Sequence, residues 1–152
     1  MKKITPFLWF DTQAEEAMNL YVSIFKNAKV LSVTPGQNGL PQSVNFELEG
    51  QEFVGFNAGP QFKFNESISF FVDCKDQKEV DYFWETLTAD GGEESMCGWL
   101  KDKYGLWWQI VPSKLVELMS DPDPEKAKRV VDAMLKMRKI VVADLEKAYA
   151  QS

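Results

Sequence analysis

The sequence contains no histidine, the side chain that most often acts as a base or a metal ligand near neutral pH. Histidine-based acid–base catalysis and histidine-bound metal are therefore excluded. The two cysteines, Cys74 and Cys97, are too few for a disulfide framework. We accordingly expect a reducing, cytoplasmic environment.

The chain also lacks a basic run and a long apolar segment. It carries 17 basic and 23 acidic residues, a net charge of −6, which argues against binding to nucleic acid or to an anionic membrane. Met1-Lys2-Lys3 has the charge of a signal peptide, but the apolar stretch behind it is short, contains Pro6 and reaches Asp11. We expect neither a signal peptide nor a membrane span.

Apolar surface, in contrast, is plentiful. The 152 residues are 45% hydrophobic and 13% aromatic, which suits one packed domain or two small fused modules. The first part of the chain predicts a strand, a helix with capping-box spacing at Thr12 and Glu15, and three strands. These strands are expected at residues 3–10, 29–34, 43–49 and 52–59.

The same order of elements then begins again. A strand at 67–73 precedes a helix that starts at Asp76 and Glu79, and strands follow near 93–96, 98–102 and 106–112. A shift of 62 residues places Phe10 on Val72, and a shift of 52 places Asn57 on Gln109. We interpret this as an internal duplication. The alternative is that any two strand–helix units look alike at this level of detail.

A tail follows both repeats. Lys114–Met119 predicts a short helix, Asp123-Pro124 begins a second with one apolar face, and residues 140–149 predict a third. Its apolar face could cover the sheet of its own chain or that of a partner chain. The sequence leaves this open.

Several blocks resemble the PhnB-like family, often labelled 3-demethylubiquinone 3-methyltransferase, within the vicinal oxygen chelate superfamily of glyoxalases, bleomycin-resistance proteins and dioxygenases. They are the opening ITPFLWFD, the central CGWLKDKYG with WQIVP, and AMLKMRKI in the tail; Val141 departs from the Asp expected there. The resemblance implies an α+β fold in which two tandem βαβββ modules form a cup. The chain would then be a single domain, 1–152, with modules at 3–59 and 67–112 and a helical tail at 113–152.

The resemblance also implies where a metal would be held. Superfamily ligands come from the first and last strand of each module, which correspond here to Thr5, Asn57, Ser67 and Gln109. All four are neutral, and a divalent ion needs charged or imidazole donors to offset its dehydration. We therefore predict no metal at these positions and no cofactor.

The same strands suit a small organic ligand. Alternation places Thr5, Phe7 and Trp9 on one face of their strand, away from the apolar residues that would pack on a helix. Such faces mix aromatic rings with hydrogen-bonding groups, as binding pockets do. The alternative is that these rings fill their own core, and Trp99 could equally pack within its hairpin. The predicted ligand-binding residues are Thr5, Phe7, Trp9, Asn57, Ser67, Phe71, Trp99, Trp107 and Gln109.

Other candidate residues have simpler explanations. Cys97 has no evident base nearby in sequence, so packing is favoured over nucleophilic chemistry. Asp102 is expected to shape the turn before Gly105. The glycines are scattered over loops and hairpins and form no nucleotide-binding turn, so we do not expect methyl transfer.

These patterns favour a metal-free small-molecule-binding protein, expected to be a homodimer. The alternative is a metal-dependent enzyme with glyoxalase- or dioxygenase-like chemistry and non-standard ligands. A third possibility is a scaffold whose cup is filled by its own side chains and whose role is association. The sequence identifies neither the ligand nor catalytic residues, and it leaves open whether a reaction is catalysed.

Overall fold

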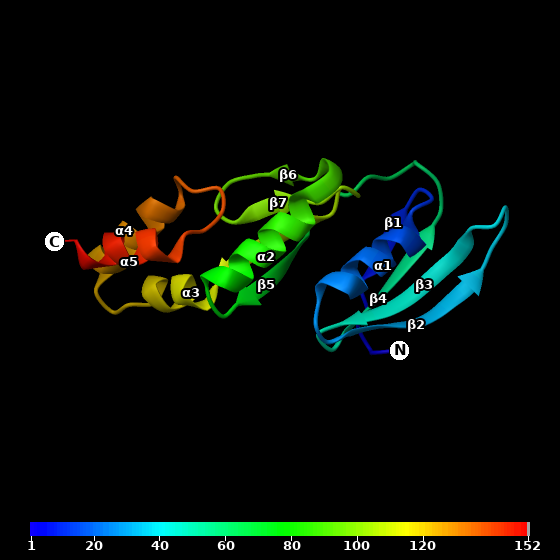
Figure 1. The fold of residues 1–152 in the computed structure, drawn as a ribbon, viewed down its shortest axis with the longest axis horizontal. Helices are drawn as coiled ribbons and strands as arrows, with labels where there is room; N and C mark the ends of the chain where they lie inside the picture. Colours follow the sequence, from blue (N-terminus) through cyan, green and yellow to red (C-terminus); the bar gives the residue numbers. More distant parts are fainter. Residues whose placement is uncertain (152) are drawn as a thin grey trace. The chain divides into compact units, whose positions relative to one another are not determined.

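A computed structural model describes residues 1–151, and they form two compact units that divide after Phe64. The first unit contains one strand, one helix and three further strands (Figure 1). The elements are β1 (Phe7–Phe10), α1 (Ala14–Ile24), β2 (Ala28–Pro35), β3 (Pro41–Leu48) and β4 (Gln51–Asn57). Its sheet has the order β1-β4-β3-β2, with β1 parallel to β4 and the other pairs antiparallel.

The second unit repeats this order and adds three helices. Its strands have the order β5-β8-β7-β6, with β5 parallel to β8. The same place for each strand in both sheets confirms two βαβββ units in an α+β fold. The elements are β5 (Ser69–Cys74), α2 (Gln77–Thr88), the 3₁₀ turn η1 (Ala89–Gly91), β6 (Glu93–Glu94), β7 (Trp99–Lys101), β8 (Trp107–Pro112), α3 (Ser113–Met119), α4 (Pro124–Met134) and α5 (Val142–Ala150).

The two main helices begin in different ways. Asp76 caps α2 as predicted, because its Oδ1 accepts a hydrogen bond from the Glu79 amide at 2.9 Å. The capping box predicted at Thr12 and Glu15 does not form, and the residue before α1 is Gln13, whose side chain makes no capping bond. A side chain from a distant strand caps α1 instead, as described below.

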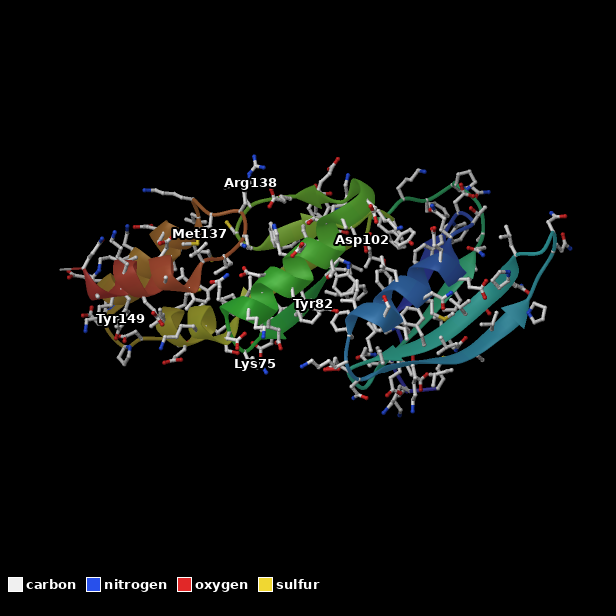
Figure 2. The ribbon with its side chains drawn as sticks, in the orientation of Figure 1. Lys75, Tyr82, Asp102, Met137, Arg138 and Tyr149 are labelled. Carbon is white, nitrogen blue, oxygen red and sulfur yellow. The ribbon has the colours of Figure 1, made fainter. Side chains whose placement is uncertain are left out.

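In the structure the tail packs against the rest of the second unit of its own chain. Backbone amides of Cys97 and Gly98 donate to the carbonyls of Met137 and Arg138, each at 2.8 Å. Figure 2 shows Met137 and Arg138 in the connector between α4 and α5. The connector thus adds backbone hydrogen bonds just before β7. A buried apolar cluster joins the tail to the end of β8, and its members are Val111, Leu115, Leu118, Val130, Ile140 and Leu145.

Side-chain bonds hold the tail at two further points. The Gln77 amide donates to the Ile140 carbonyl at 3.0 Å and accepts from the Val142 amide at 2.7 Å. The Tyr149 hydroxyl donates to Asp121 at 2.7 Å, which lowers the pKa of that carboxyl and raises the pKa of the tyrosine. Within residues 1–151, no helix is both long and apolar enough to cross a membrane.

Gly98 provides a test of how closely the tail approaches β7. Its φ is +84°, and a Cβ there would meet the Ile110 carbonyl oxygen at 2.9 Å and Ile140 Cγ1 at 3.1 Å. Gly105 has a similar φ, +91°, with nothing within 4 Å of its Cβ position. Both Gly→Ala variants carry a strain of about 1–2 kcal/mol. We expect the free energy of unfolding, measured in urea, to fall by roughly 1–3 kcal/mol more in Gly98→Ala than in Gly105→Ala, because only the Cβ at position 98 meets other atoms. Equal losses would contradict this close packing.

Candidate functional site

Each sheet has one face against a helix and one face that stays partly open. In the second unit, the helix side carries Trp108 and Ile110, which are 3% and 0% exposed. The alternate residues of β8, Trp107 and Gln109, are only half-buried. Because side chains alternate along a strand, these two residues lie on the opposite, open face of the sheet.

The strand register brings an amide and three aromatic residues together on this face. Gln109 pairs with Trp99 of β7 on one side and with Phe71 of β5 on the other. Trp107 pairs with Ser69, and the Trp99 and Trp107 rings are 6.5 Å apart at an angle of 60°. We call these residues, Ser69, Phe71, Trp99, Trp107 and Gln109, the Gln109 face.

Gln109 keeps hydrogen-bonding capacity on this face. Its Nε2 donates to the Ser69 hydroxyl at 2.9 Å. Within residues 1–151 its side chain makes no other hydrogen bond, which leaves the amide oxygen and one N–H for a ligand. Phe71 is 53% exposed, so one wall of the site is open to solvent. Four of the nine predicted ligand-binding residues lie on this face.

The open face of the first unit is aromatic along β1 and β4, and half-buried polar residues of β3 adjoin it, since Ser43 pairs with Phe56 and Asn45 with Val54. Phe7 and Trp9 of β1 both contact Phe56 of β4 edge-to-face, with ring centroids 4.7 and 5.0 Å apart. Trp9 also contacts Phe62 at 4.9 Å, and its indole N–H donates to the Gly59 carbonyl at 2.8 Å. The indole is therefore fixed by the chain. Phe7 and Phe62 remain 60% and 65% exposed.

The structure corrects the face predicted for Asn57. Its Oδ1 accepts from the Ala14 amide at 2.9 Å and its Nδ2 donates to the Pro41 carbonyl at 2.9 Å. Asn57 thus caps α1 and lies on the helix side of the sheet, where Phe53 also stacks on Phe46. Gly55, between them in β4, carried the missed signal, because a glycine inside a strand often marks a close approach of neighbouring groups. A Cβ there would lie 3.2 Å from Phe10 and Val44 side chains.

Thr5 and Ser67 also differ from their predicted places, because both precede the strands that were expected to hold them. The Thr5 hydroxyl donates to the Lys2 carbonyl at 2.9 Å, before β1 begins at Phe7. The Ser67 hydroxyl donates to Asn65 Oδ1 at 2.6 Å, before β5 begins at Ser69. Local turns hold both hydroxyls. The ligand contacts predicted for Thr5, Asn57 and Ser67 remain predictions.

These four positions do not fit the metal that the superfamily implies. Hydrogen bonds to the backbone or to a neighbouring side chain already engage the polar groups of Thr5, Asn57 and Ser67. Gln109 supplies only a neutral amide. In the described part of the chain, no three cysteine or acidic side chains gather closely enough to hold a metal ion. Neutral oxygens alone offset the dehydration of a divalent ion poorly.

The remaining candidate residues have structural roles. Asp102 is 1% exposed and shapes the turn as predicted, accepting from the Tyr104 and Leu106 amides at 2.9 and 3.0 Å. Its Oδ2 also accepts from the Trp108 indole at 2.9 Å.

The two cysteines show no sign of nucleophilic chemistry. Cys97 lies in a turn with positive φ. Burial raises the pKa of the Cys74 thiol to about 12, which makes it a poor nucleophile.

A match to one family model confirms the resemblance to the PhnB-like family. A family model described as 3-demethylubiquinone-9 3-methyltransferase matches residues 2–111. This chain belongs to that family. The match spans both βαβββ units and ends within β8, so the tail lies outside the matched residues.

Solved structures agree with this family. A PhnB protein from Bacillus cereus, whose description carries the same methyltransferase name, is 34% identical, with a TM-score of 0.68 over 73% of this chain and 99% of its own. Protein PA1353 from Pseudomonas aeruginosa is 15% identical, with a TM-score of 0.60 over 74% and 98%. A glyoxalase-related enzyme from Fulvimarina pelagi is 13% identical, with a TM-score of 0.51 over 73% and 88%. These last two support the predicted vicinal oxygen chelate fold alone. No curated protein matches the chain.

Asp102 should contribute strongly to the stability of the second unit. In Asp102→Asn, the side-chain N–H₂ would face a donor that now binds a carboxylate oxygen. We therefore expect the free energy of unfolding, measured in urea, to fall by roughly 2–3 kcal/mol. Asp144→Asn, at the exposed start of α5, should stay within about 0.5 kcal/mol of the parent protein. If both variants unfold like the parent, the three hydrogen bonds to Asp102 contribute little.

Proposed function

We propose that this protein binds a small organic molecule on the Gln109 face, without a metal ion. The observation that carries the proposal is the Gln109 amide, which keeps an unused oxygen and N–H between aromatic residues. An amide that offers a donor and an acceptor can orient a polar group, while Trp99, Trp107 and Phe71 contact a flat or apolar body. All five residues of the Gln109 face lie on the paired strands β5, β7 and β8. The groups that would contact a ligand are therefore held by rigid elements.

The donor chemistry favours binding without a metal. The residues of the Gln109 face provide a hydroxyl and an amide, and neither gives the anionic oxygen or imidazole that a resident ion would need. A polar organic group needs no such donor, since neutral hydrogen bonds suffice for it.

The family name does not transfer easily to this chain. Bound adenosine cofactors usually lie at a glycine-rich turn between a parallel strand and a helix. Here β1 leads into α1 through Asp11, Thr12 and Gln13, and β5 leads into α2 through Lys75 and Asp76. Neither connection contains a glycine. This supports binding rather than methyl transfer.

Gln109→Leu should separate binding from stability. The variant loses one neutral hydrogen bond, to a Ser69 hydroxyl that water can reach, so unfolding free energy should fall by no more than about 1 kcal/mol. Benzamide, a flat ring with a complementary amide, is a suitable probe. In ¹⁵N NMR titrations it should shift the Gln109 side-chain amide and the indole signals of Trp99 and Trp107.

In Gln109→Leu the affinity for benzamide should drop roughly 2- to 10-fold, the value of one or two hydrogen bonds. Gln42→Leu, an exposed amide change in β3, is the matched control and should bind like the parent. Benzamide shifts confined to other residues, or a Gln109→Leu variant with unchanged affinity, would contradict the proposed site.

Elemental analysis tests the metal-free part of the proposal. Protein purified without chelators should contain only substoichiometric nickel, zinc, iron and manganese, because the donors are neutral. Adding chelator should leave benzamide titrations unchanged. One bound equivalent of any of these metals would instead favour the metal-dependent enzyme.

A further inference from the structure

The Gln109 face continues into a cleft whose charge points to the class of ligand. This cleft, about 600 Å³ and open to solvent, lies where the end of β5 meets α3. We call it the α3 cleft. Its lining residues are Phe71, Asp73, Ser113, Val116 and Glu117.

One part of the α3 cleft is apolar and exposed. Phe71 of β5 and Val116 of α3 are 53% and 49% exposed, although both are large hydrophobic residues. A phenyl ring presents a negative π face, which attracts organic cations. The volume lies in the range of small-molecule sites, roughly 300–1,000 Å³.

The other part of the α3 cleft is negatively charged. Ser113 donates to Asp73 Oδ1 at 2.8 Å, and in the described residues no hydrogen bond occupies Oδ2. Glu117 has Lys114 as a neighbour, with the Glu117 Oε1 atom 3.4 Å from the Lys114 Nζ atom. This exposed contact between Glu117 and Lys114 neutralises one charge at most, so a negative charge remains beside the Phe71 ring.

Strand geometry connects the cleft to Gln109. Asp73 follows Phe71 by two residues in β5 and so lies on the same face, about 7 Å further along the strand. Phe71 pairs with Gln109 in the register. A single molecule can therefore meet the amide at one end and the carboxylates at the other.

We propose that the ligand carries an ammonium group, which binds in the α3 cleft between the Asp73 and Glu117 carboxylates and against the Phe71 ring. This rests on the proposed function, because Phe71 belongs to both the Gln109 face and the cleft. An organic cation fits better than a metal ion, since two of the five lining residues are apolar and only two carboxylates are present. The net charge of −6 also attracts cations to the protein.

Three probes of similar shape test the charge preference. Benzylammonium, benzyl alcohol and phenylacetate share a phenyl ring but carry positive, no and negative charge. In low-salt ¹⁵N NMR titrations, benzylammonium should bind several times more tightly than benzyl alcohol, and phenylacetate should bind least. Added salt should reduce the preference, because exposed charges are screened.

Two variants locate the cation. Asp73→Asn and Glu117→Gln should each weaken benzylammonium binding roughly 2- to 5-fold, the effect of one exposed charge, and leave benzyl alcohol unchanged. Glu85→Gln, an exposed carboxylate on α2, is the matched control and should change neither. Urea unfolding of each variant confirms that the fold is kept.

The outcomes separate the two proposals. Equal affinity for the three probes, or equal loss in the Glu85→Gln control, overturns the ammonium inference while the Gln109 face still binds neutral rings. If no probe shifts Phe71, Trp99 or Gln109 signals, both the inference and the proposed function are wrong. A charge preference that depends on Asp73 and Glu117 supports both.

Discussion

One helix can cover only one face of a four-stranded sheet, and the rest of this structure depends on that constraint. α1 and α2 each bury a single face of their sheet, where residues such as Phe46 and Ile110 are almost fully enclosed. The other face of each sheet keeps large aromatic residues partly in water. Apolar surface left in this state costs free energy, roughly 25 cal/mol per Å². A ligand that covers it gains part of that energy on binding, because association itself costs free energy.

The two open faces differ in what they can do. In the first unit the indole N–H of Trp9 is bonded to the Gly59 carbonyl, and the rings of Phe7, Trp9 and Phe56 share their face with Ser43 and Asn45 of β3. In the second unit, Gln109 and Ser69 add an oriented amide and a hydroxyl, and carboxylates follow along the same strand. The two units share one framework, but the side chains on their open faces differ.

The sequence predicted the architecture well because hydrophobic periodicity and chain order determine it. Both βαβββ units, the Asp76 and Asp123 caps and the Asp102 turn follow from local patterns. The placement of Asn57 was wrong because its partners, Ala14 and Pro41, are distant in sequence. The sequence also predicted that the first and fifth strands begin earlier than they do, since they begin at Phe7 and Ser69. The side-chain turns at Thr5 and Ser67 compete with strand pairing there. The α3 cleft was missed because it depends on how a helix packs at the end of a strand.

The long-range cap at Asn57 has a consequence for how the chain folds. α2 begins with a side chain three residues from its partner, so its first turn can form as soon as that short segment is made. The corresponding bond of α1 can form only when β4, 43 residues further along the chain, has docked beside β1. Ordering so long a loop costs conformational entropy that a local cap does not require. A peptide of α2 therefore contains its own N-terminal cap, whereas a peptide of α1 does not.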